Sequence, residues 1–200
     1  MSELEALAAQ VAQCTQCLLH RGRTNTVPGE GPEHADIMFI GEAPGFHEDQ
    51  QGRPFVGAAG KFLDELLESI GLTRKDVFIA NVIKCRPPGN RDPLPEEIEA
   101  CKPFLDRQIE LVQPKLVVTL GRFSMARAFP KARISRIHGQ PRKIDGVLYY
   151  PMYHPAAALH QPSLRSVIKE DMLRIPELIE QAAQIAESTL PTEAEQLQLL

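Results

Sequence analysis

The sequence has no apolar run that approaches the ~20 residues needed to cross a membrane. Its first residues, MSELEALAAQVAQC, lack the basic n-region of a secretory signal peptide. No internal repeat or low-complexity tract is present. We therefore expect a cytoplasmic, monomeric protein without membrane contact. Its 200 residues suffice for one domain with a substantial core, predicted here over residues 1–187, with a disordered tail over 188–200.

The charge is unevenly distributed. The net charge of −4 argues by itself against a nucleic-acid partner. Residues 84–143, however, carry 13 basic and 6 acidic side chains, a net charge of +7. The segments on either side are acidic, with 6 basic and 12 acidic side chains in 1–83 and 3 and 8 in 144–200. A basic centre in an acidic chain is expected when one face binds phosphate, although a solvated charged face would give the same pattern.

Hydrophobic periodicity predicts strands that alternate with helices. Strands are expected at 37–40, 77–83, 115–120 and 146–153. Helices are expected near 2–12, 58–70 and 95–112, shortly after Gly121, and from Ser163 to about Glu187. This alternation indicates an α/β fold with a mainly parallel sheet of about four strands, covered on both faces.

The segment DIMFIGEAPGFHEDQQGRPFVGAAG, residues 36–60, follows the first predicted strand. It is dense in glycine and proline, and Phe55 stands alone among polar neighbours. In open α/β sheets, ligands bind in the crevice beyond such strand ends. We interpret the segment as the floor of a binding site; the alternative is a long flexible loop.

Only four cysteines occur, as Cys14-x2-Cys17 and Cys85-x15-Cys101. A cytosolic location disfavours disulfides. Four thiolates with a close first pair suit either a tetrahedral zinc or an iron–sulfur cluster. The second pair is spread more widely than a zinc knuckle, which favours the larger cluster.

Four other side chains fall at or beyond predicted strand ends: Glu42, Phe55, Asn81 and His154. A parallel sheet would bring these ends to one edge of the molecule. An aromatic ring, an amide and an imidazole together can recognise a nucleic-acid base. Each alone has a structural alternative, as a core aromatic, a turn residue, a cap or a surface histidine.

Several motifs occur together in this chain. GEAPG at 41–45 is combined with HPAAAL at 154–159, NVIKCRPPGNRDP at 81–93 and the cysteine spacing above. In this combination, from about Cys14 to Ile179, the sequence resembles the family 4 uracil-DNA glycosylases, the iron–sulfur branch of the uracil-DNA glycosylase superfamily. The resemblance implies a three-layer α/β/α sandwich. It also implies a [4Fe-4S] cluster on Cys14, Cys17, Cys85 and Cys101.

The resemblance further implies a DNA repair enzyme. Such an enzyme flips deoxyuridine out of single- or double-stranded DNA and hydrolyses its N-glycosidic bond. It releases uracil and leaves an abasic site, without a lyase step. The uracil contacts implied are Gly41, Glu42, Ala43, Phe55, Asn81 and His154. The implied insertion loop in the minor groove is Pro155, Ala156, Ala157, Ala158 and Leu159. Expected phosphate contacts are Lys84, Arg86 and Arg91.

Two positions depart from the best-known branch of the superfamily. Ala43 stands where that branch has a water-positioning aspartate, and Gly45 where it has a tyrosine that excludes thymine. We therefore expect Glu42 and His154 to be catalytic, with Glu48 and Asp49 as further candidates for the general base.

Two other functions remain open. One is an electron-transfer or regulatory iron–sulfur protein that binds DNA without catalysis. The other is a covalent uracil-DNA binder. The covalent branch has a basic insertion with a histidine, and the segment CRPPGNRDP has none.

Overall fold

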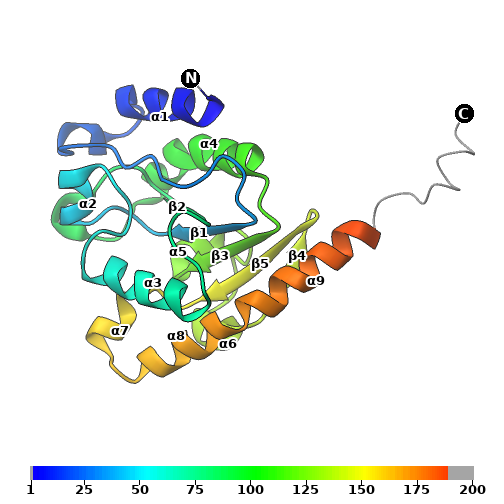
Figure 1. The fold of residues 1–200 in the computed structure, drawn as a ribbon. Coiled ribbons are helices and arrows are strands. Elements are labelled where there is room, and N and C mark those ends of the chain that lie inside the picture. Colours follow the sequence, from blue (N-terminus) through cyan, green and yellow to red (C-terminus); the bar gives the residue numbers. More distant parts are fainter. Residues whose placement is uncertain (1, 189–200) are drawn as a thin grey trace, which may run out of the picture.

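The computed structural model describes residues 2–188, with a five-stranded sheet at the centre (Figure 1). The strand order is β2-β1-β3-β5-β4. The four parallel strands are β1 (Ile37–Gly41), β2 (Phe78–Asn81), β3 (Leu116–Leu120) and β5 (Val147–Met152). Strand β4 (Arg142–Ile144) pairs antiparallel with β5 at one edge. The predicted α/β class is confirmed, but the sheet has five strands rather than about four.

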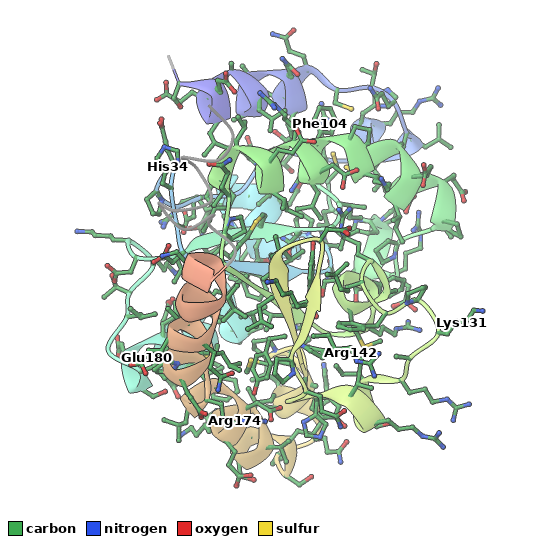
Figure 2. All side chains as sticks on the ribbon, turned by 90° about the vertical axis from the view of Figure 1, so that its right-hand side faces the viewer. His34, Phe104, Lys131, Arg142, Arg174 and Glu180 are labelled. Carbon is green, nitrogen blue, oxygen red and sulfur yellow. The ribbon has the colours of Figure 1, made fainter. Side chains whose placement is uncertain are left out.

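Helices cover both faces of the sheet (Figures 1 and 2). One face packs against α3 (Ala58–Ser69), α8 (Leu164–Leu173) and α9 (Ile175–Ser188). The other face packs against α4 (Pro95–Val112), and α1 (Glu3–Gln13) lies outside α4. Phe104, labelled in Figure 2, lies on the side of α4 that faces α1. The layers are those of an α/β/α sandwich with one additional outer helix.

Local chemistry explains why the predicted helices form. In α3, Phe62, Leu63, Leu66 and Leu67 recur at helical spacing and are all buried against the sheet. Helix α4 begins at Pro95, whose missing N–H costs nothing in the first turn. These two helices occur where the sequence predicts them.

Two predicted elements differ from the structure. The 36–60 segment is not entirely loop, because α2 (Phe46–Gln51) forms inside it. The single helix predicted after Ser163 is broken between α8 and α9 at Arg174. Pro176 lies directly after this break, and proline fits the first turn of a new helix better than the interior of a long one. The remaining short helices are α5 (Arg122–Ala126), α6 (Ile134–Ile137), α7 (Ala157–His160), η1 (Leu18–Arg21) and η2 (Pro88–Asn90).

The fold places several predicted site segments at one edge. The parallel strands end there in Gly41, Asn81, Leu120 and Met152. Among the helices described, none is long and apolar enough to cross a membrane. The tail predicted to be disordered lies outside the described residues, apart from Ser188 at the end of α9.

Candidate functional site

Strand register brings the first two site residues together. Gly41 at the end of β1 is paired with Asn81 at the end of β2. A Cβ on residue 41 would lie 2.4 Å from Asn81 Oδ1 and 2.6 Å from the Phe55 ring. Only glycine therefore permits the amide and the ring to approach each other across this strand end.

A cavity of about 170 Å³ opens beside these residues. It is lined by Ala43, Gly45, Glu48, Phe55, Ala59, Asn81, His154 and Ala156. Four of the predicted uracil contacts, Ala43, Phe55, Asn81 and His154, thus share one cavity. Gly41 lies behind the Asn81 amide, and Glu42 lies in a neighbouring groove.

The Asn81 side chain carries an unusual atom for a protein interior. Asn81 is only 2% exposed, yet its Oδ1 has no hydrogen-bond partner among the residues described. A buried acceptor left unpaired costs about 1–3 kcal/mol. Such an atom at a cavity is a natural partner for a ligand N–H group.

Phe55 and His154 form the stacked wall of the cavity. Their ring centroids lie 5.4 Å apart with an interplanar angle of 24°. His154 follows β5 by two residues and lies against Gly121, where an added Cβ would be 3.1 Å from the His154 Cβ. The two rings, from segments far apart in the chain, together form an aromatic wall that a flat heterocycle can contact.

The hydrogen bonds of His154 define its tautomer. The Ala156 backbone N–H donates to His154 Nδ1 over 3.1 Å. Burial lowers the pKa of His154 to about 4, so the ring is neutral at physiological pH. Because Nδ1 accepts, the single ring proton resides on Nε2. His154 therefore offers an N–H donor and no charge.

The three carboxylates proposed as bases have different surroundings. Glu48 accepts the backbone N–H groups of Gly45, Val56 and Gly57 at 2.9–3.1 Å. Asp49 is buried and accepts the Thr24 N–H at 2.9 Å. Both are committed to holding the loop.

The Glu42 carboxylate, by comparison, is not held by hydrogen bonds to the loop. No hydrogen bond to its side chain occurs within residues 2–188. Burial, followed by the nearby Asp92 carboxylate, raises the pKa of Glu42. It lines a groove of about 420 Å³ that shares Ala43, Gly45, His154 and Ala156 with the cavity.

The predicted insertion loop forms the short helix α7 and the residues before it. Pro155 and Ala158 are buried, whereas Ala156 and Ala157 line the groove. Leu159 is 46% exposed and is the large apolar side chain of this segment that faces solvent.

The predicted phosphate contacts require a correction. Lys84 is 1% exposed, and its Nζ donates to the Asn81 carbonyl at 2.8 Å and to Gln108 Oε1 at 2.6 Å. Burial lowers its pKa to about 7. Lys84 therefore does not reach DNA. Arg91 is paired with both oxygens of Glu97, while Arg86 is partly exposed over the Phe46 ring.

The four cysteines, which form two pairs far apart in the sequence, lie around one pocket. Cys14, Cys17, Cys85 and Cys101 line one pocket between α1 and α4, although no group of three or more His, Cys, Asp or Glu side chains in the described part meets the geometry for a single metal ion. The Lys84 backbone N–H points at Cys101 Sγ at 3.3 Å.

Arg23 is a pocket residue that sequence reasoning missed. It donates to Cys85 Sγ at 3.2 Å and to the Cys14 carbonyl at 2.9 Å. The one sequence feature that could have indicated Arg23 is its position six residues after Cys17.

Comparison with known proteins agrees with this geometry. The model of the uracil DNA glycosylase superfamily matches residues 28–175. A Type-4 uracil-DNA glycosylase of Sulfurisphaera tokodaii is 50% identical over 188 residues, which cover 89% of this chain and 86% of that protein. Type-4 enzymes of Archaeoglobus fulgidus and Thermotoga maritima are 47% and 44% identical, over 89% and 84% of this chain and 94% and 91% of their own lengths. The resemblance carried by the GEAPG and HPAAAL motifs is confirmed. The chain belongs to the uracil-DNA glycosylase superfamily, in its type-4 branch.

Proposed function

We propose that this protein excises uracil from DNA by hydrolysing the N-glycosidic bond of a flipped deoxyuridine. The observation that carries the proposal is the unpaired, buried Asn81 Oδ1 in a cavity suited to one base. Uracil presents an N3–H donor that this acceptor can receive, whereas cytosine presents an acceptor at the same place. Type-4 relatives at 44–50% identity support the same activity.

His154 is proposed to stabilise the leaving group. Bond cleavage places negative charge on uracil, and Nε2–H of the neutral ring can donate to its O2. A fixed neutral donor acts without transferring its proton, and its hydrogen bond strengthens as negative charge develops on uracil. The Ala156 N–H holds the ring in this tautomer.

Glu42 is proposed as the general base that activates water. Its raised pKa and its lack of a hydrogen-bond partner among the described residues suit proton abstraction. It lies across the shared wall from the base cavity, where water can approach the sugar from the groove. Glu48 is instead proposed to hold the loop.

Leu159 is proposed to fill the space that the flipped nucleotide leaves in duplex DNA. We expect Leu159→Ala to lower kcat/KM on duplex uracil by about tenfold or more, but on single-stranded uracil by less than about twofold, because only a duplex needs a wedge. Gel-based excision assays on matched substrates measure both. Leu173→Ala, which truncates a leucine on α8 that is 58% exposed, is the control. Equal losses on the two substrates would contradict intercalation.

A [4Fe-4S] cluster is proposed on Cys14, Cys17, Cys85 and Cys101. The donor set fits this group: four thiols share one pocket, and Arg23 and the Lys84 N–H donate to two of the sulfurs. Such donors stabilise thiolate ligands. When bound, the cluster would supply a cross-link between the N-terminal segment and α4. Hydrolysis itself transfers no electrons.

DNA phosphate is proposed to contact one of the predicted cations, Arg86, and further cations that were not predicted. Besides Lys84 and Arg86, five cations of the basic region lack a carboxylate partner within residues 2–188: Lys131, Arg133, Arg136, Arg142 and Lys143. Lys131 extends outward from its loop (Figure 2). Together with Arg86 they are candidates for contacts with the DNA backbone.

We also propose a monomer with a single domain over residues 1–187 and a cytoplasmic location.

The function is tested on oligonucleotides with one uracil. We expect free uracil, with strand scission only after alkali, because no lyase step is proposed. Asn81→Asp should lower kcat/KM on uracil at least about tenfold, since a carboxylate offers no N–H donor and brings charge into a buried site. The same oligonucleotide with cytosine is the control. No uracil released by the wild type, or unchanged uracil preference in Asn81→Asp, would overturn the assignment.

A further inference from the structure

The backbone of Phe55 adopts an unfavourable conformation. Its φ is +53°, in the left-handed region, where a bulky side chain is a genuine outlier. The residue is 5% exposed, and its ring stacks on the His154 ring to form the wall of the cavity. Such backbones persist only where the surroundings over-determine them. Something outside the cavity must therefore hold this turn.

Arg74 contacts the turn from behind. Its guanidinium donates to the Pro54 carbonyl at 2.8 Å and also to the Phe55 carbonyl. The guanidinium is itself fixed by two carboxylates, Asp64 at 2.6 Å and Glu30 at 2.9 Å. Its side chain is 19% exposed. A planar fork held in this way can bind two consecutive carbonyls at a defined angle.

The other side of the turn is held by a negatively charged side chain, the carboxylate of Glu48. Glu48 Oε1 accepts the N–H groups of Val56 and Gly57, each at 2.9 Å. The two carbonyls before the turn thus face a cation, and the two amides after it face a carboxylate. Gly60 leaves the space for this arrangement, because a Cβ there would lie 1.7 Å from the Phe55 carbonyl oxygen.

We propose that Arg74 is the positioning residue of Phe55, holding its ring in the orientation that stacks on the base before the base arrives. Arg74 does not line the base cavity, and it acts only through the turn. The expected loss of uracil excision rests on the proposed function. The expected loosening of the Phe55 turn does not. Preorganising the ring removes an ordering step from base binding.

The chain offers a matched control. Arg53 pairs with the same Glu30, at 2.8 Å, but is 56% exposed and makes no hydrogen bond to Pro54 or Phe55. Arg74→Lys keeps the positive charge beside Glu30 and Asp64 but lacks the fork. We expect Arg74→Lys and Arg74→Met to lower kcat/KM for single-stranded uracil by roughly 5- to 150-fold, the range of one lost base–aromatic stack. Arg53→Met should stay within about twofold of the wild type.

A double-mutant cycle distinguishes positioning from general destabilisation. Phe55→Ala combined with Arg74→Lys should lose no more kcat/KM than Phe55→Ala alone, because Arg74 acts through that ring. Losses that multiply would overturn the proposal, as would full activity of Arg74→Lys.

Hydrogen exchange provides a readout without turnover. In Arg74→Lys, amide exchange at residues 55–57 should accelerate at least about tenfold, with β1 and β3 unchanged and no such change in Arg53→Met. Unchanged protection of the turn would overturn the inference. If the wild type released no uracil, the proposed function would fail while this measurement still decided the role of Arg74.

Discussion

His154→Phe is expected to lower kcat by about 10²- to 10³-fold while the protein remains folded. The substituted ring retains the stack on Phe55 but loses the Nε2–H that is proposed to donate to uracil O2. Losing one preorganised donor at a developing anion commonly costs this much. Single-turnover excision measures the effect. Because the base can still enter the cavity, KM should change far less than kcat.

The control is the same substitution outside the site. His34 is exposed and does not line the cavity, so His34→Phe should leave kcat unchanged. A similar loss in both variants, or full activity of His154→Phe, would remove His154 from the chemistry.

The pH dependence follows from the neutral ring. Since the pKa of His154 is lowered to about 4, the ring should stay neutral and its contribution to kcat constant above pH 6, and it should change only as the pH falls through about 4. The unfolded chain, with a pKa near 6.5, binds one proton more than the native state between these values. Stability should therefore fall as the pH drops from about 6.5 to 4, and this part of the fall should be absent in His154→Phe. An acid limb at pH 6.5 that disappears in His154→Phe would show a charged resting ring.

Cys85→Ser is expected to abolish most soluble folded protein, together with the brown colour that the proposed [4Fe-4S] cluster would give the wild type. Cys85 lies four residues after Asn81, and its pocket joins the N-terminal segment to α4. Binding energy at such a site is folding energy, so losing one thiol should cost a large part of the ~5–15 kcal/mol that stabilises a domain. Soluble yield, visible absorbance and iron content measure the result.

Leu105→Ala is the matched control for lost packing. Leu105 is fully buried on α4, in the same core cluster as Cys85 and Cys101. Its truncation should destabilise by about 2–5 kcal/mol but leave the colour and iron content per folded molecule intact. Stoichiometric zinc without visible absorbance would refute the cluster, and turnover that followed the redox state would refute a purely structural role.

Local pattern was enough to predict much of the fold. Helix α4 occurs at the predicted residues because Pro95, an acidic first turn and periodic apolar side chains all favour the same start and face. Strand β4 was not predictable in this way. It has three residues with no buried side chain, and it forms because β5 offers an open edge for pairing.

The sequence by itself determined the family, the α/β class and the side chains available at the strand ends. Motif identity and strand order along the chain carry that information, because parallel strands bring Gly41, Asn81 and His154 to one edge whatever their exact packing. Only the tertiary structure decided which individual side chains are buried, which are paired and which backbone positions are strained. Lys84 is basic in sequence but turns inward to the Asn81 carbonyl, and Arg74, remote along the chain, holds the turn of Phe55. Burial, pairing and backbone strain depend on neighbours that are distant in sequence, so no local pattern records them.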